Sequence, residues 1–125
     1  MKKLLSFLRT PFLWVLLLPY AFIFAGAASN QLVIIANHGK FPVRTNAVHA
    51  LKWVDPENPL PDGMLDEVHC IMTDETHLNF LADIIDEHEA VKSVGDLALE
   101  FGEWSNTFAP FLYIGLVIVE LKKKE

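Results

Sequence analysis

Two apolar segments lie near the ends of this 125-residue chain, and a long polar region separates them. The first segment carries no charged side chain from Pro11 to Ala28 and is rich in leucine and aromatic residues. About 18 residues of α-helix rise roughly 27 Å, close to the thickness of a bilayer's hydrocarbon core, about 30 Å. The segment also lacks the polar face that a helix on a small soluble protein needs. It therefore predicts a transmembrane helix over residues 11–29.

The same segment also fits a secretory signal peptide or a signal anchor. It has a basic start and an apolar run, and Ala25, Gly26 and Ala27 provide the small residues of a cleavage site. Against cleavage stand Pro19 and an apolar run longer than a usual signal core. Both alternatives place the region that follows on the same side of the membrane.

The second apolar stretch, Phe108–Leu121, is interrupted by Glu120 and followed by three lysines at 122–124. Extending the stretch back to Trp104 gives about 18 residues, enough to cross a bilayer. We therefore expect a second transmembrane helix over 104–121; Pro110 lies in the first turn of the stretch Phe108–Leu121, where proline is tolerated. The alternative is an amphipathic or core-packed C-terminal helix.

Basic residues gather at the two ends of the chain. Six lysines and arginines lie in residues 1–10 and 122–125, whereas four lie in residues 30–103. Because loops rich in lysine and arginine stay in the cytoplasm, we predict that both termini are cytoplasmic, in a bacterial inner or plasma membrane. The chain then divides into a basic cytoplasmic N-terminus (1–10), a first span (11–29), an acidic extramembrane domain outside (30–103), a second span (104–121) and a basic cytoplasmic tail (122–125).

The first part of the middle region shows short extended patterns and turns. Gln31–Ala36 predicts either a short strand or a continuation of the first helix, and Phe41–Val43 an extended corner. Several prolines, together with Gly63, indicate a solvent-exposed loop over Lys52–Gly63.

The second part of the middle region shows helical patterns. Apolar residues between Thr73 and His88 fall at helical spacing, which predicts a helix there. Ser93 and Asp96 have the spacing of a capping box and open an amphipathic stretch. The fold class that we expect is a mainly α membrane protein. Two transmembrane helices flank a small α-rich extramembrane domain with little or no strand.

Three blocks of the middle region carry a resemblance. They are Ala36-Asn37-His38-Gly39-Lys40-Phe41-Pro42-Val43, His69 to Ile85 with Thr73-Asp74-Glu75-Thr76-His77-Leu78-Asn79-Phe80-Leu81-Ala82-Asp83 at its centre, and Ser93-Val94-Gly95-Asp96. In this order they resemble a family of small, uncharacterised bacterial membrane proteins. That family has the patterns Ala-Asn-Gly-Gly-x-Met-Pro-Val, Thr-x-x-Thr-Arg-Leu-x-Phe-Leu-Gly-Asp and Ser-Val/Ile-Gly-Asp. This chain departs from the patterns at His38 (glycine), Phe41 (methionine), His77 (arginine) and Ala82 (glycine). The resemblance implies a membrane-associated module and supplies no activity.

The densest set of potential metal ligands is His69, Cys70, Asp74 and His77. Their spacing fits none of the usual structural zinc patterns, and the resemblance places an arginine at His77, so we predict no metal and no cofactor. Cys70 has no second cysteine with which to form a disulfide, and the adjacent His69 is poorly placed to activate it.

The charge of the middle region excludes several functions. Fourteen acidic and four basic residues give residues 30–103 a net charge of −10, which argues against nucleic-acid binding. No EF-hand spacing and no glycine-rich phosphate loop occurs in the sequence. The first span contains no ionisable residue of the kind that a substrate path needs, and the second contains Glu120 at its edge.

These patterns favour a non-enzymatic role. We expect an accessory or interaction subunit that lies in the lipid bilayer and either docks on a larger membrane complex or associates with itself. Two alternatives stay open, an oligomeric pore or holin-like protein and a membrane-anchored metal-dependent enzyme. The residues that we expect to shape the module are Asn37, Gly39, Pro42, His69, Thr73, Thr76, Asp83, Ser93, Gly95 and Asp96.

Overall fold

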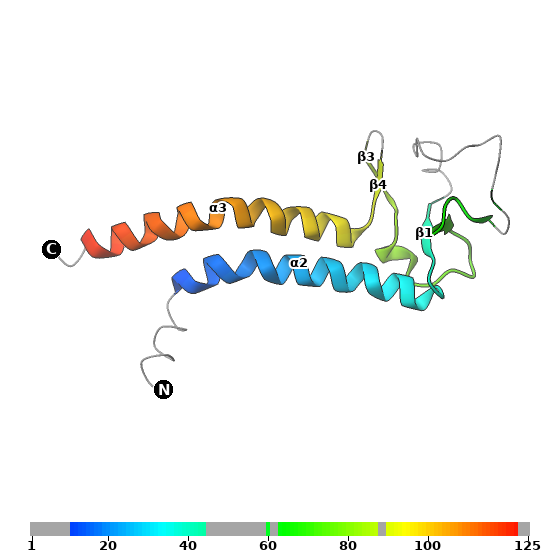
Figure 1. The fold of residues 1–125 in the computed structure, drawn as a ribbon, viewed down its shortest axis with the longest axis horizontal. Helices are drawn as coiled ribbons and strands as arrows, with labels where there is room; N and C mark the ends of the chain where they lie inside the picture. Colours follow the sequence, from blue (N-terminus) through cyan, green and yellow to red (C-terminus); the bar gives the residue numbers. More distant parts are fainter. Residues whose placement is uncertain (1–10, 45–59, 61–62, 88–89, 123–125) are drawn as a thin grey trace, which may run out of the picture. The chain divides into compact units, whose positions relative to one another are not determined.

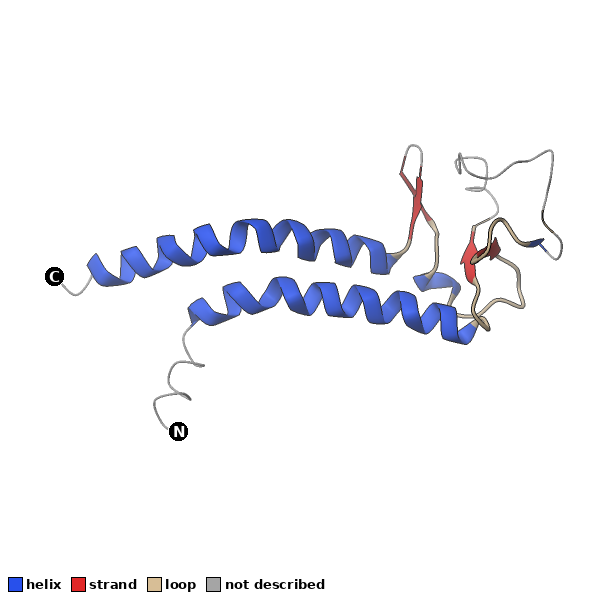
Figure 2. Ribbon diagram, in the orientation of Figure 1, coloured by secondary structure: helices blue, strands red, loops and turns tan. Residues whose placement is uncertain are grey.

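The computed structural model describes residues 11–44, 60, 63–87 and 90–122. The chain divides into two compact units, Met1–Phe24 with Ala98–Glu125, and Ala25–Leu97. Figure 1 shows the order of the elements and Figure 2 their types. The elements are α2 (Pro11–Ala36), β1 (Phe41–Val43), β2 (His69–Ile71), the 3₁₀ helix η3 (Asn79–Leu81), β3 (Ile85–Glu87), β4 (Ala90–Lys92) and α3 (Val94–Lys122).

Helix α2 is the apolar helix predicted at the N-terminus. It has 26 residues, and its stretch Leu13–Ala36 is long and apolar enough to cross a membrane. These 24 residues rise about 36 Å as an α-helix. The helix expected over 11–29 is therefore confirmed and extends further. The strand considered for Gln31–Ala36 is wrong, because that segment continues the helix.

Helix α3 joins two stretches that the sequence pattern had separated. Its 29 residues include both the amphipathic stretch that follows Ser93 and the apolar stretch over 104–121. Pro110 therefore lies inside a continuous helix. The expectation that it lies in the first turn of a helix is wrong. Proline has no N–H, so the carbonyl one turn earlier, at Asn106, has no helical donor. The helix over 104–121 is confirmed, and its crossing of a membrane stays a prediction.

In the first unit, α2 and α3 pack through a glycine. A Cβ atom on Gly102 would lie 2.6 Å from Ile23 Cγ1 and 2.8 Å from the Pro19 carbonyl oxygen. The rings of Phe22 and Phe101 meet edge to face, with their centroids 4.7 Å apart. Gly102 therefore allows the two backbones to approach more closely than any other residue would permit.

In the second unit, β1 runs between two other segments. It pairs in parallel with β2, so that Phe41 lies opposite His69 and Val43 opposite Ile71. On its other side, the Asp83 N–H donates to the Pro42 carbonyl at 3.1 Å, and the Arg44 N–H donates to the Asp83 carbonyl at 2.9 Å. Proline lacks an N–H, and Pro42 is tolerated because the residues that flank β2, Val68 and Met72, bond to the backbone of Phe41 and Val43 on either side of it.

The core of the second unit is small. Val33 from α2, Phe41 from β1 and Ala82 are buried together, and four partly buried side chains pack against them. These four are Ile34, Met72, Leu78 and Leu81. The core thus joins the C-terminal end of α2 to strand β1 and to the segment that precedes Asp83.

The helix expected over 73–88 is wrong for its described residues, 73–87. Side chains there bind the backbone in place of helical hydrogen bonds. The Thr73 N–H donates to Thr76 Oγ1 at 3.1 Å, and Asn79 Nδ2 donates to the Thr73 carbonyl at 3.1 Å. Leu78 has a φ of 56°, which ends any right-handed helix. After η3 the chain forms the antiparallel pair of β3 and β4, in which Ile85 lies opposite Lys92; His88 lies outside the described residues.

The C-terminal end of α2 follows a recurrent capping geometry. The Gly39 N–H donates to the Ile34 carbonyl at 2.8 Å, and the His38 N–H donates to the Ile35 carbonyl at 3.3 Å. This is the Schellman motif, whose first residue beyond the helix end adopts a left-handed conformation. His38 occupies that position with a φ of 56°, and Gly39 follows with a φ of 92°. The family pattern has glycine at the position of His38, and glycine adopts this left-handed conformation at little cost.

The packing at Gly102 gives a first prediction. Replacing Gly102 with alanine should destabilise the protein by about 1–3 kcal/mol, because the new methyl group collides with Pro19 and Ile23. Gly115 is the matched control, since a Cβ there meets nothing within 4 Å and alanine favours helix by about 1 kcal/mol. Thermal unfolding in one detergent compares the two variants. Equal unfolding temperatures for G102A and G115A would contradict the close packing.

Candidate functional site

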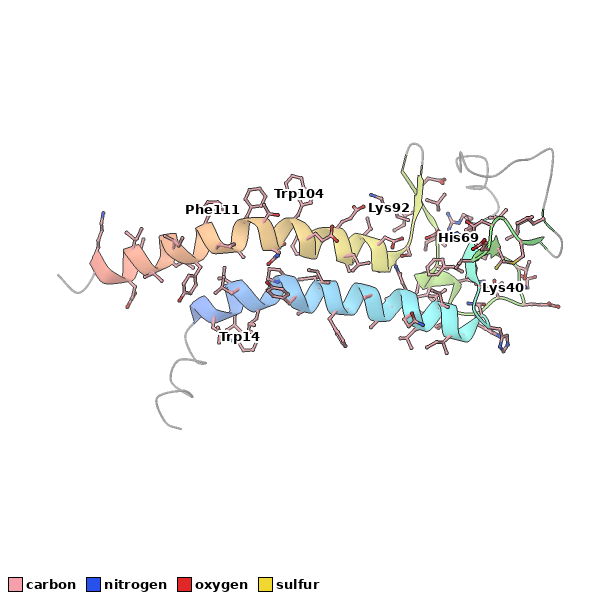
Figure 3. All side chains as sticks on the ribbon, in the orientation of Figure 1. Trp14, Lys40, His69, Lys92, Trp104 and Phe111 are labelled. Carbon is pink, nitrogen blue, oxygen red and sulfur yellow. The ribbon has the colours of Figure 1, made fainter. Side chains whose placement is uncertain are left out.

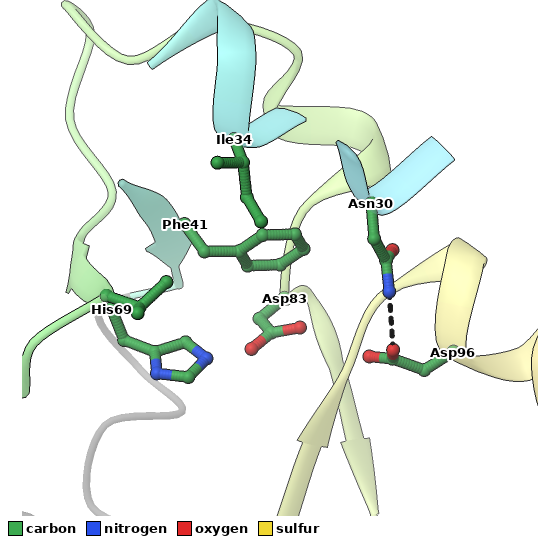
Figure 4. Close-up of a pocket in the computed structure, with 7 residues that line it drawn as sticks. Asn30, Ile34, Phe41, His69, Asp83 and Asp96 are labelled. Carbon is green, nitrogen blue, oxygen red and sulfur yellow. Dashed lines mark hydrogen bonds between the residues drawn. The ribbon is translucent and has the colours of Figure 1, made fainter. Parts of the chain in front are cut away.

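A cavity of about 160 Å³ in the second unit brings together residues from distant parts of the chain. Figure 4 shows the Asp83 carboxyl group near the Phe41 ring, with His69 on one side of it and Asn30 and Asp96 on the other. The lining residues are Asn30, Ile34, Phe41, Val68, His69, Asp83 and Asp96. Three of them, His69, Asp83 and Asp96, are among the residues that the sequence predicted to shape the module.

Asn30, Ser93 and Asp96 form a closed ring of hydrogen bonds at one side of the cavity. Asn30 Nδ2 donates to Asp96 Oδ1 at 2.7 Å, and the Ser93 hydroxyl donates to Asn30 Oδ1 at 2.8 Å. The Ser93 N–H donates to Asp96 Oδ2 at 2.9 Å, and the Asp96 N–H donates back to Ser93 Oγ at 2.9 Å. The capping box predicted for Ser93 and Asp96 is therefore confirmed, and Asn30 joins it to α2.

Gly95 is required by the same arrangement. A Cβ atom at this position would collide with the Asn30 side chain and lie 2.8 Å from the Gly26 carbonyl oxygen. Gly95 is buried at the start of α3, where the backbone of α2 comes close. The residue predicted to open the last helix therefore also sets the distance at which Asn30 meets Asp96.

Asp83 is a buried acid whose side chain has no hydrogen-bonding partner among the described residues. Its side chain and backbone together expose 5% of their surface, and its N–H and C=O are bonded to Pro42 of β1 and to Arg44 just after it. Within the described residues, no hydrogen bond or ion pair reaches its carboxyl group. Burial and, to a smaller extent, the negative charge of Asp96 raise the pKa of Asp83, and His69 opposes both effects; together they place the pKa at about 7.

His69 is held in the cavity by Asp66. Its Nδ1 atom lies 2.6 Å from Asp66 Oδ2, while Asp66 Oδ1 accepts the N–H groups of Val68 and His69 at 2.7 and 2.6 Å. Partial burial would raise the pKa of Asp66, but these two backbone donors and the His69 ring together lower it to about 2. Asp66 is therefore ionised at neutral pH and fixes the orientation of the imidazole ring.

The remaining predicted residues lie away from this cavity. Asn37 is buried, and its side chain donates to the carbonyls of Val33 and His77 and accepts the His77 N–H at 2.7 Å. It therefore fastens the loop around His77 to the end of α2. Thr73 and Thr76 form the hydrogen-bonded turn described above, and Gly39 and Pro42 shape the connection from α2 into β1.

The weak metal candidates do not converge. His69 and Cys70 are consecutive in β2, so their side chains point to opposite faces; Cys70 lines a different pocket, which also includes His77. Among the described residues, no group of three or more His, Cys, Asp or Glu side chains is placed to hold a metal ion. Burial raises the pKa of the Cys70 thiol, although Lys40 opposes this, so the thiol stays protonated at neutral pH.

Two residues of the site were missed from the sequence, Asn30 and Asp66. Asn30 gave a weak signal, because it belongs to the polar run Ser29-Asn30-Gln31 in a helix that is otherwise apolar. Asp66 gave less, since it is one of many acids in the middle region and its pairing with His69 depends on a tight turn. The Leu65 N–H closes that turn by donating to the His69 carbonyl at 2.8 Å.

Comparison with known families gives one match. Residues 9–105 match the model of a family described as "Family of unknown function (DUF5317)", and the chain therefore belongs to this family. This confirms the resemblance to an uncharacterised family. Neither the curated proteins nor the solved structures contain a significant match to the chain.

The ring of hydrogen bonds gives a second prediction. Asn30→Ala should destabilise the protein by about 2 kcal/mol, because a charged carboxylate and a buried hydroxyl lose their partner. Gln31→Ala changes an exposed neighbour in the same helix and should move stability by less than about 0.5 kcal/mol. Thermal unfolding measures both variants. Equal losses would show that the amide of Asn30 does not hold the two helices together.

The buried acid gives a third prediction, on pH. The pKa of Asp83 is about 7 in the folded protein and 3.8 when the residue is unperturbed, so between these values only the unfolded chain has released the proton. Stability should therefore fall as the pH rises from about 4 to 7 and then level off. Asp66 acts with the opposite sign and at lower pH, between about 2 and 4.

The test of this prediction is Asp83→Asn, which places a neutral isostere in the same position. At pH 4 the variant should match the parent protein, and at pH 8 it should be more stable by up to about 4 kcal/mol. Asp74→Asn is the control, because Asp74 is exposed. Unfolding curves over this pH range that coincide for D83N and the parent would refute the assignment of a buried charge.

Proposed function

We propose that this member of the family of unknown function is a small integral membrane protein without enzymatic activity. Its helices α2 and α3 form a transmembrane hairpin, and the module between them lies outside the membrane. This module docks on a partner in a larger membrane complex, which makes the protein an accessory subunit of a bacterial inner or plasma membrane.

The observation that carries the proposal is the apolar surface of the helices in the first unit. Trp14 of α2 is 64% exposed, and Trp104 and Phe111 of α3 are 71% and 73% exposed. Figure 3 shows Trp14 projecting from α2, and Trp104 and Phe111 projecting from α3 away from the facing helix. Water is a poor environment for so many exposed large apolar side chains, whereas lipid chains accommodate them.

The topology of the proposal rests on charge. Two spans place both termini on the same side of the membrane. The excess of lysine and arginine in residues 1–10 and 122–125 favours a cytoplasmic location for both termini. The acidic residues 30–103 then lie outside. Trp104, near one end of the proposed second span, is a residue type that favours the membrane–water interface.

We favour a docking role over catalysis because the polar side chains of the module form hydrogen bonds within the fold. Asn30, Ser93 and Asp96 bond to one another, and Asn37 bonds to the backbone, so these side chains build the fold. The protonated Cys70 thiol is a poor nucleophile. The described residues therefore offer a shaped acidic surface more readily than a set of reacting groups.

The experiment that tests the proposal is purification of the tagged protein from its native membrane in mild detergent. We expect a protein partner in near-stoichiometric amount by mass spectrometry, and no bound metal. Recovery of the protein alone, together with toxicity on overexpression and dye leakage from vesicles, would favour the oligomeric pore. Stoichiometric zinc that is lost on His69→Ala would favour the metal-dependent enzyme.

A further inference from the structure

We propose that the cavity beside Asp83 binds a compact organic cation, a primary ammonium group on a short alkyl chain. Two sources share this chemistry, the lysine side chain of a protein partner and a free small amine. The first source rests on the proposed docking function, and the second does not.

The negative wall of the cavity carries the inference. Asp83 is buried with 5% of its surface exposed, lines the cavity, and accepts no hydrogen bond from the described residues. The backbone hydrogen bonds of Asp83 to Pro42 and Arg44 fix the position of this residue at the cavity wall. A buried carboxylate without donors is costly, and a bound ammonium group would supply three N–H donors and a compensating charge.

The other walls suit the rest of such a ligand. Ile34, Phe41 and Val68 line the same cavity and present apolar surface to the methylene groups of an alkyl chain. The Phe41 ring near the Asp83 carboxyl group also offers a face to a cation. Asp96 adds a second negative charge, while its own oxygens already accept hydrogen bonds from Asn30 and Ser93.

A metal ion fits this cavity less well. Calcium takes six to eight oxygen ligands and zinc takes four close ligands. The described His, Cys, Asp and Glu residues include no group of three that could hold such an ion. An ammonium group needs fewer fixed ligands, and the −10 charge of residues 30–103 would attract cations to this part of the chain.

Binding of this kind has a defined pH dependence. The cation requires the ionised form of Asp83, so affinity should fall about tenfold for each pH unit below 7 and level off above it. Among the described residues, the charged groups that act on Asp83 are Asp96 and His69.

The experiment uses the full-length protein in lipid nanodiscs, labelled with ¹³C at the aspartate carboxyl groups, and n-butylammonium as the probe. We expect saturable binding that lowers the pKa of Asp83, with an affinity about 100-fold weaker at pH 5 than at pH 8. Asp83→Asn should abolish binding, and this variant should fold well because it removes a buried charge. Asp74→Asn should bind like the parent, and neutral n-butanol should not compete.

Two results would overturn the proposal. One is the absence of a saturable shift at the Asp83 carboxyl carbon, and the other is equal binding of n-butylammonium to D83N and to the parent. To separate the two sources, the D83N and D74N variants are purified from the native membrane. Loss of the partner with D83N alone assigns the cation to a lysine of the partner. Retention of the partner, together with butylammonium binding by the parent, assigns it to a free amine.

The two proposals can fail separately. If the parent protein brings no partner from the membrane, the docking function fails, while the butylammonium titration still decides whether the cavity binds cations. If a partner is recovered and the titration is negative, the docking function stands and the cation site is rejected.

Discussion

The arrangement of the second unit depends on a single amide group, that of Asn30. It lies in the short polar run Ser29-Asn30-Gln31 of the otherwise apolar helix α2, and it bonds both to the hydroxyl and to the carboxylate of the capping box that begins α3. Asp96 at the first turn of α3 is favoured by the helix dipole, and Asn30 converts that local preference into a link between two helices. Because Asn30 and Asp96 both line the cavity, the same link sets its position beside Asp83.

The sequence predicts those parts of the fold whose signal is local. The uncharged run of α2 and the capping box at Ser93 each reside in one short segment, and the structure confirms both. The helix predicted over 73–88 does not form in the described residues 73–87. Leu78 and Leu81 have helical spacing, but the same spacing lets both pack against the core through the 3₁₀ helix η3. Side-chain hydrogen bonds from Thr76 and Asn79 then outweigh a weak helical preference.

The parts that could not be predicted depend on pairs of residues far apart in the chain. The sequence around Asp83 does not indicate that its backbone pairs with Pro42 and Arg44. It also does not indicate that Asp83 and the distant Asn30 line the same cavity. The sequence indicates Asp83 as part of a motif that shapes the module, and the helix expected over 73–88 does not form around it. The structure assigns the pairing to the Asp83 backbone and leaves its carboxyl group without a structural partner among the described residues.

This division between backbone and side chain bears on why an acid occupies the position. The ladder beside β1 needs the N–H and C=O of Asp83, which almost any residue supplies, and the cavity would be more stable around a neutral side chain. The neighbouring Asp96 increases the cost, because it is itself fixed by Asn30 and Ser93 and cannot turn away. A buried acid that no described residue contacts through its side chain is a strain of the kind that functional sites carry. The proposed ligand therefore accounts for the carboxyl group of Asp83 better than any contact with the described residues does.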